Sequence, residues 1–289
     1  MDGARTGDGG GREVWRVAEA LRARMADGAY PLGGQLPAQR ELAHEFGVSR
    51  DTVQRALKDL IAEGWIESRQ GSGSRVIKTQ RVQSLTPKSP RSARTALGPI
   101  IGRAFEQPEV TLDVYTLTSE TLDTHIRLQA ERIRAREIAP QSIAVRMLLP
   151  SEDLDFPFPR AVDHPDDPRL RERLLAITGR HTSSLRNVLE ALRVEGLVPS
   201  VDLEIRHVPL VPPYKLYLLN GAEALQGFYE VLERPIVLDG PEEVVALDVL
   251  GLGATLIHYL RDDDPDSTGS VFVTSSQAWF DSVLSLLAK

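Results

Sequence analysis

The 289-residue chain contains no cysteine, so neither disulfide bonds nor thiolate metal sites can form. It also has no apolar run near the roughly 20 residues that a membrane-spanning helix needs. The first residues lack the apolar core of a signal peptide. These absences predict a protein of the reducing cytoplasm without membrane contact, with residues 1–11 as a disordered leader.

Clusters of metal ligands are missing as well. The six histidines show no pairing at three- or four-residue spacing and no His-Glu-x-x-His motif. The acidic stretch RDDDPDSTGS, residues 261–270, lacks the distal Glu of a calcium loop and is expected to be a solvated turn. No metal site and no cofactor are therefore expected.

Charge is spread unevenly along the chain, whose formal net charge is −7. Residues 1–97 carry a net charge of +5, whereas residues 98–289 carry −12. A basic first part joined to an acidic second part predicts a polyanion-binding domain attached to a domain that binds no polyanion. Between them, residues 81–107 are rich in Ser, Pro and Arg at their start, and we expect a solvated linker there.

Residues 12–80 carry the pattern of three helices followed by two short strands. Apolar side chains recur at helical spacing in residues 12–25, 38–46 and 49–61. Gly47 is expected to end the second helix, and Ser49 to cap the start of the third. The third helix would bury Val53, Ala56, Leu57, Leu60 and Ile61 and leave Arg50, Thr52, Gln54, Arg55 and Lys58 on its outer face.

The outer face of the third helix has the chemistry of a DNA-reading surface. A helix that enters the major groove can pair Arg with guanine, at about 1–3 kcal/mol of discrimination for a good pair. The hydroxyls of Ser49 and Thr52 suit phosphate oxygens. WIESRQ and SRVIK then alternate like two strands of a wing, where Gly71 and Gly73 permit close approach to the sugar-phosphate chain.

The motif LPAQRELAHEFGVSRDTVQRALKDLIAEGWIESRQGSGSRV, residues 36–76, resembles the GntR-type winged-helix domain of bacterial transcription regulators. This resemblance implies a winged helix-turn-helix bound to double-stranded operator DNA. It implies DNA contacts for Arg40, Arg50, Thr52, Gly71 and Gly73, and we place Ser49, Gln54 and Arg55 on the same surface. Some family members carry Arg at the position of Gln54, so the operator sequence stays open, although Gln can itself read adenine.

Residues 108–289 alternate between strand and helix patterns, which predicts an α/β layered domain. EVTLDVYTL and the nearly continuous apolar run SIAVRMLLP are expected to be strands. SETLDTHIRLQAERIRARE lies between them as a helix, with Ser119 as its N-cap. Residues 167–195 and 275–288 are also expected to be helical.

Residues 213–231, PYKLYLLNGAEALQGFYEV, resemble a degenerate, catalytically defective form of the phospholipase D signature. Lys215 stands at the lysine of that signature and Asn220 at its aspartate, but Pro213 replaces the nucleophilic histidine, and proline has no nucleophilic nitrogen. The resemblance implies a phospholipase D-like fold without catalysis, in which Lys215 and Asn220 are candidate effector-binding residues. In the alternative interpretation, Lys215 merely projects from an edge strand.

The sequence as a whole predicts a cytoplasmic bacterial transcription regulator that acts as a homodimer and is not an enzyme. Residues 108–289 would supply effector sensing, dimerisation or both, and an effector of Lys215 would be anionic. Two alternatives stay open. One is a phosphodiesterase or nuclease tethered to DNA, and the other is a regulator whose second domain only docks proteins.

Overall fold

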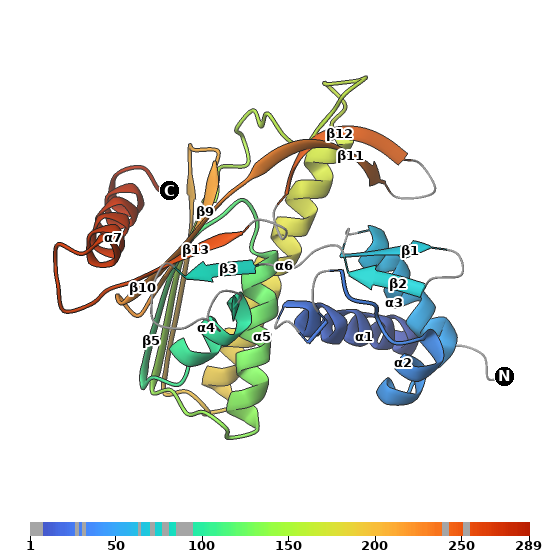
Figure 1. Ribbon diagram of the computed structural model, residues 1–289, viewed down its shortest axis with the longest axis horizontal. Coiled ribbons are helices and arrows are strands. Elements are labelled where there is room, and N and C mark those ends of the chain that lie inside the picture. Colours follow the sequence, from blue (N-terminus) through green and yellow to red (C-terminus); the bar gives the residue numbers. More distant parts are fainter. Residues whose placement is uncertain are drawn as a thin grey trace. The chain divides into compact units, whose positions relative to one another are not determined.

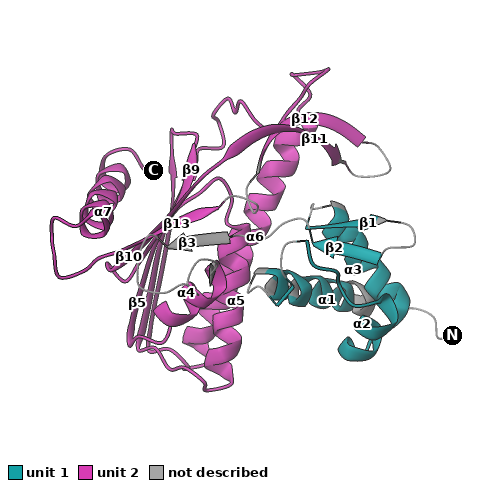
Figure 2. Cartoon of the chain, viewed as in Figure 1, with its two compact units in different colours: residues 1–79 teal, residues 80–289 magenta. Residues whose placement is uncertain are grey.

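The computed structural model describes residues 8–26, 29–30, 33–62, 65–69, 73–76, 81–84, 95–238, 243–250 and 255–289. The chain divides into two compact units, residues 1–79 and residues 80–289 (Figure 2). Each unit has its own buried apolar side chains, and each is described by itself below.

Unit 1 begins with three helices, α1 (Asp8–Ala26), α2 (Gln39–Phe46) and α3 (Arg50–Ala62). Their apolar stripes form one small core, as the helical spacing predicts. The buried members include Val17, Leu21, Met25, Leu42, Val53, Ala56 and Leu60. Two expectations are corrected: α1 begins at Asp8, so residues 8–11 are helical rather than a leader, and Ile61 is 40% exposed rather than part of the stripe.

The wing of unit 1 is an antiparallel pair, β1 (Ile66–Arg69) and β2 (Gly73–Val76), in which Arg69 lies opposite Gly73. Residues 33–36 run along the other side of β2. The Leu36 N–H donates to the Ser74 carbonyl at 2.8 Å, and the Val76 N–H donates to the Gly34 carbonyl at 2.9 Å. The wing is therefore tied by backbone hydrogen bonds to the segment that leads into α2.

Unit 2 is built on a mixed eight-stranded sheet (Figure 1). Its strands, in spatial order, are β4 (Thr95–Ala96), β3 (Arg81–Ser84), β13 (Leu256–Leu260), β10 (Glu223–Phe228), β9 (Tyr214–Leu219), β5 (Glu109–Tyr115), β6 (Ser142–Pro150) and β8 (Ser200–Val208). The β5–β6–β8 part is parallel, whereas β9 and β10 are antiparallel to their neighbours. The α/β layered domain expected from the sequence is present.

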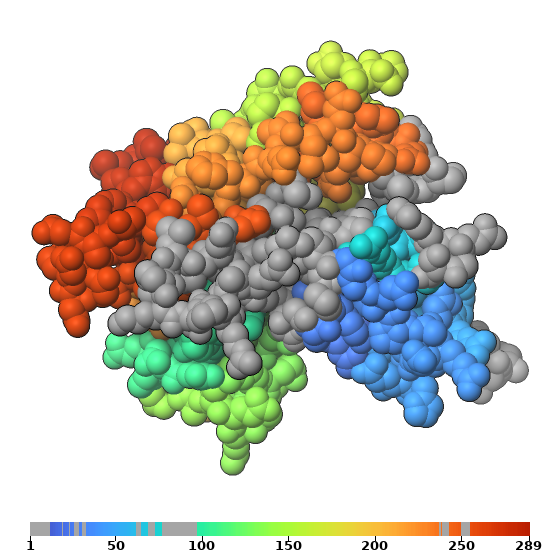
Figure 3. Space-filling view, in the orientation of Figure 1, coloured from blue at the N-terminus to red at the C-terminus, as the bar shows by residue number. Residues whose placement is uncertain are grey.

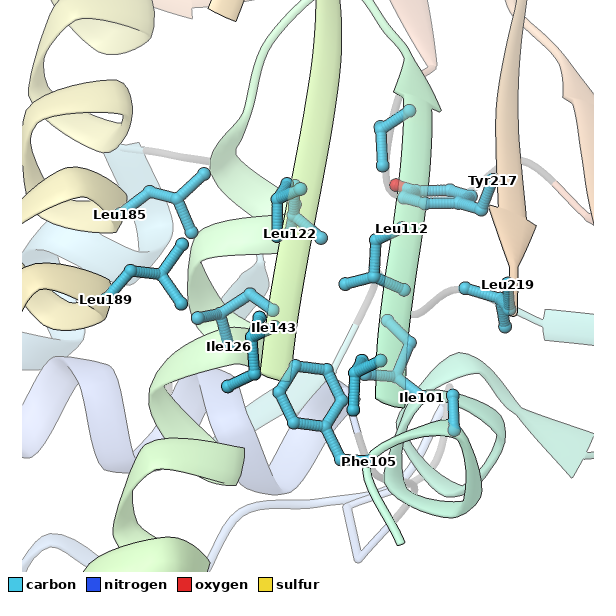
Figure 4. Close-up of a cluster of buried hydrophobic side chains, with 14 of the residues drawn as sticks. Ile101, Phe105, Leu112, Leu122, Ile126, Ile143, Leu185, Leu189, Tyr217 and Leu219 are labelled. Atoms are coloured by element: carbon cyan, nitrogen blue, oxygen red, sulfur yellow. The ribbon is translucent and has the colours of Figure 1, made fainter. Parts of the chain in front are cut away.

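Helices cover both faces of this sheet (Figure 1). Three of them, α4 (Leu97–Ala104), α5 (Glu120–Arg134) and α6 (Arg169–Val194), pack on one face, and α7 (Thr268–Leu286) packs on the other. On the first face, Ile126 of α5 and Leu189 of α6 belong to the same buried cluster as Leu112 of β5 and Tyr217 of β9 (Figure 4). Burial on both faces explains why β5 and β6 are so apolar in sequence.

A second, three-stranded sheet consists of β11 (Glu230–Val237), β12 (Glu243–Leu250) and the short β7 (Arg160–Ala161). One face of this sheet packs Ala246 and Ile236 against Leu170 of α6. The opposite face carries exposed apolar side chains, and residues of the β11–β12 hairpin, drawn in orange, reach the surface in Figure 3.

The segment expected to be a linker, residues 81–107, is largely part of unit 2. Its residues form β3, which pairs with β13, then β4, and then α4, whose Ile100 and Ile101 are buried in the main core. The prediction was wrong for these elements because strands of two to four residues leave no readable periodicity in the sequence. Residues 85–94 lie outside the described residues.

Candidate nucleic-acid interface and predicted effector residues

The start of α3 is fixed by Ser49, as the sequence predicts for an N-cap. The Ser49 Oγ accepts the backbone N–H of Thr52 at 3.1 Å and lies 2.9 Å from the Thr52 Oγ1. One of the unpaired amides of the first turn is thereby satisfied. The Ser49 and Thr52 hydroxyls, which were expected to contact phosphate oxygens, therefore also stabilise the N-terminus of α3.

The predicted reading residues stand free of the protein. Arg40 on α2 and Arg50, Gln54 and Arg55 on α3 are all exposed. Within the described part of the chain, none of these four side chains takes part in a hydrogen bond or an ion pair. Arg50 and Gln54 are four residues apart and share one face of α3, so they can contact neighbouring base edges without breaking an existing interaction.

Arg55 differs from Arg50 in its electrostatic surroundings. Asp51 and Asp59, both exposed, lie one turn before and one turn after it on α3. These two carboxylates reduce the positive potential around Arg55. Of the two arginines on α3, Arg50 at the N-terminus is therefore the better placed for a polyanion.

Contacts from α1 hold α2 in place. The Arg24 guanidinium pairs with Glu45 and donates to the Tyr30 hydroxyl at 3.0 Å, and the Arg16 guanidinium donates to the Phe46 carbonyl at 2.9 Å. The pair raises the pKa of Arg24 and lowers the pKa of the Glu45 carboxyl, chiefly through their hydrogen bond. Gly47 then ends α2 in the left-handed conformation, with φ of 65°, as expected of a C-cap glycine.

In the wing, Gly73 has a φ of 76°, and no atom of the described residues lies within 4 Å of the position a Cβ would take. Its backbone conformation, rather than crowding, requires glycine. The Arg75 guanidinium turns back to donate to the Gly33 carbonyl at 2.9 Å and holds the wing to residues 33–36. Gly71, the other predicted contact of the wing, lies outside the described residues.

The two predicted effector residues of unit 2 are not brought together. Lys215, near the start of β9, is only 3% exposed, and β9 lies between β5 and β10, so the interpretation that Lys215 projects from an edge strand was wrong. Asn220 follows the other end of β9, about 17 Å away along an extended chain. Its side chain accepts the Thr111 N–H at 2.8 Å and donates to the Ala104 carbonyl at 3.1 Å. Asn220 thus stabilises a turn, and only Lys215 stays a candidate.

Sequence reasoning missed the polar side chains around Lys215. Its Nζ lies 5.7 Å from the ring centre of Tyr229, whose hydroxyl bonds the Thr116 hydroxyl at 3.0 Å and accepts the Leu117 N–H at 2.9 Å. Ser119 stands before α5, but its hydroxyl makes no capping hydrogen bond there. No spacing in the sequence marks these residues, because they come from the segment between β5 and α5, from β9 and from the junction of β10 and β11.

Two further properties concern the described residues only. No group of three or more His, Asp or Glu side chains among them could hold a metal ion. None of the helices is both long and apolar enough to cross a membrane in the part of the chain that the structure describes.

Comparisons with known proteins agree with the N-terminal geometry. Residues 14–76 match the family model described as "Bacterial regulatory proteins, gntR family". An uncharacterized HTH-type transcriptional regulator of Rhizobium meliloti (strain 1021) is 36% identical over 98 residues, which are 34% of this chain and 38% of that protein. The Exu regulon transcriptional regulator of Escherichia coli (strain K12) is 42% identical over 65 residues, 22% of this chain and 25% of its own length.

Among solved structures, the AraR DNA-binding domain in complex with operator ORE1 is 29% identical, with 26% of this chain and 93% of that chain covered and a TM-score of 0.23. The first unit is a winged helix-turn-helix of the GntR type, as the sequence predicts. The family match ends at residue 76, and the chain spans well under two thirds of the two relatives' length. The phospholipase D-like identity of unit 2 stays a prediction.

Proposed function

We propose that this protein is a sequence-specific DNA-binding transcription regulator. The observation that carries the proposal is the exposed, uncommitted face of α3, with Arg50 and Gln54 following a capped N-terminus inside a GntR-type winged helix. In this proposal α3 enters the major groove, Arg50 pairs with guanine, and Gln54 reads adenine. Arg40 and the backbone near Gly73 contact the phosphates that flank the site.

The operator is proposed to be two-fold, read by two copies of the chain. The support comes from the outer face of the β11–β12–β7 sheet. Strand pairing aligns Val162, Val245 and Pro235 in one row and Arg160, Leu247 and Glu233 in the next. A two-fold axis parallel to the strands would set Arg160 of one copy opposite Glu233 of the other, across the apolar side chains. Such a face is self-complementary in charge, so a second copy is its proposed occupant.

Unit 2 is proposed to sense an effector rather than to catalyse. Pro213 lies where the phospholipase D signature has its nucleophilic histidine, and proline cannot attack phosphorus. An effector would act by binding one arrangement of the two DNA-binding units better than another, since a ligand with equal affinity for both shifts nothing.

Fluorescence anisotropy tests the proposal. The full-length protein is titrated into a labelled duplex from its own upstream region and into a scrambled duplex, across a series of salt concentrations. We expect tight binding to the native duplex alone, with log K falling linearly against log salt as phosphate contacts release counterions. Equally weak binding to both duplexes, followed by failure to select any site from random DNA, would refute a sequence-reading regulator.

A further inference from the structure

Fully buried polar side chains gather where β5 ends and α5 begins. Ser119 and His125 are 0% exposed, and Lys215 from β9 is 3% exposed. Thr121, one turn before His125 on α5, hydrogen-bonds the hydroxyl of Tyr217 on β9. Lys215, two residues before Tyr217, lies on the same face of the sheet because side chains alternate along a strand. Lys215 interacts electrostatically with His125. It also lies beside Tyr229, whose hydroxyl bonds Thr116 and Leu117, just before Ser119. The three buried groups therefore lie around the first two turns of α5.

Two of these residues lack hydrogen-bond partners. Among the residues that the structure describes, neither ring nitrogen of His125 has a hydrogen-bond partner. The Ser119 hydroxyl has none there either. Leaving such a group buried and unpaired destabilises the folded protein. Other polar groups in the region are already engaged, since Thr116 and the Tyr229 hydroxyl bond each other and the backbone. Ser119 and His125 are thus available to something outside the protein.

The electrostatics of the region favour a negative charge. Burial, aided by the charge of Lys215, lowers the pKa of His125 to about 4, so this imidazole is neutral at pH 7 and offers one N–H donor. The buried carboxylate on α5, Asp123, is committed to His181 at 2.9 Å and Ser184 at 2.6 Å. Glu120, in the first turn, is only half-buried. The N-terminus of the 15-residue α5 adds its dipole.

We propose that Ser119, His125 and Lys215 form a binding site for a small oxyanion group, a phosphate or a carboxylate, carried by the effector of this protein. The O–H of Ser119, the imidazole N–H and the ammonium group of Lys215 donate to its oxygens, at the positive end of the α5 dipole. This inference rests on the proposed function in that the bound oxyanion belongs to the ligand that unit 2 senses.

Isothermal titration of the full-length protein with inorganic phosphate, without DNA and in amine buffer at constant ionic strength, tests the site. Acetate in a second arm separates a carboxylate preference from a phosphate preference, and chloride is the blank. We expect saturable binding of at least one oxyanion. Saturable binding of neither, in protein that still binds its operator, overturns the inference and leaves the proposed function standing.

Substitutions locate the bound anion. In Ser119→Ala no existing hydrogen bond is lost, so thermal unfolding should be unchanged while oxyanion affinity falls by about tenfold. Lys215→Met should abolish binding, and Lys289→Met, the same change at an exposed lysine of unit 2, should leave it intact. Arg50→Ala should also leave it intact, which separates this site from phosphate binding by unit 1. Unchanged oxyanion affinity in Ser119→Ala would overturn the assignment. If Lys215→Met folds, unchanged affinity in that variant would overturn it as well.

Discussion

Arg50 is the residue on which DNA reading depends most directly in this proposal. Its guanidinium is exposed and makes no interaction within the described residues, so Arg50→Ala should leave folding intact. Operator affinity should fall by about 1–3 kcal/mol through loss of a bidentate contact to guanine. Anisotropy on the native duplex measures the loss, and Arg180→Ala, an exposed arginine of α6, is the matched control. A change smaller than about 0.3 kcal/mol, below the lower end of that range, would remove Arg50 from the reading face.

Arg55 should matter less than Arg50, although the sequence places both on the outer face of α3. Asp51 and Asp59 flank Arg55 on adjacent turns and offset its charge. We expect Arg55→Ala to weaken operator binding by less than Arg50→Ala in the same anisotropy experiment. Equal losses would mean that the carboxylates do not screen Arg55 in the complex.

His125 predicts a pH dependence of stability. Its pKa is about 4 in the folded protein and about 6.5 in an unfolded chain. Because the unfolded state binds the proton first, stability is lost as the pH falls through this window, by about 2 kcal/mol between pH 7 and pH 5. Urea unfolding in amine buffers should show this loss in the wild type and a shallower one in His125→Gln. Parallel pH profiles would contradict a neutral, buried His125.

At the scale of elements, hydrophobic periodicity in the sequence predicted several helices and the two long buried strands correctly. The helices α1, α2, α3 and α5 and the strands β5 and β6 were predicted, because each buries a regular stripe or a continuous apolar run. β3 and β4 were not predicted. They form only two or three residue pairs, with β13 and with each other, and this pairing depends on contacts between segments far apart in the sequence. The sequence named Lys215 as a candidate residue but did not predict its burial. That burial depends on the strand order, which places β9 in the middle of the sheet.

Gly269, in the first turn of α7, shows how tightly that helix sits on the sheet. A Cβ added there would lie 2.0 Å from the Leu260 carbonyl oxygen of β13. Gly269→Ala should therefore destabilise unit 2 by about 2 kcal/mol or more, as expected of forced overpacking. Gly179→Ala, the same change in the exposed middle of α6 with no atom within 4 Å, should instead stabilise it by about 0.5–1 kcal/mol. Thermal unfolding that moves both variants in one direction would contradict the packing of α7.

At the scale of the whole molecule, the uneven charge limits where two copies can meet. Residues 98–289 carry a net −12, so this part of one copy repels the same part of another unless their contact is apolar and locally complementary. The outer face of the β11–β12–β7 sheet meets both conditions, with Val245 48% exposed between Val162 and Pro235. The Arg160 and Glu233 side chains lie at its two margins.

Val245→Glu should therefore convert a dimer into a monomer without unfolding it, because the side chain is already exposed in the single chain. A buried, unpaired carboxylate at the centre of an interface costs several kcal/mol, enough to shift the dimer dissociation constant by more than about a hundredfold. Sedimentation velocity measures the mass, and Val194→Glu, at an exposed valine near the end of α6, is the matched control.

A charge exchange makes the test specific for a two-fold contact. Arg160→Glu and Glu233→Arg should each weaken the dimer, and their combination should restore it, whereas a dimer indifferent to all three changes must use another surface.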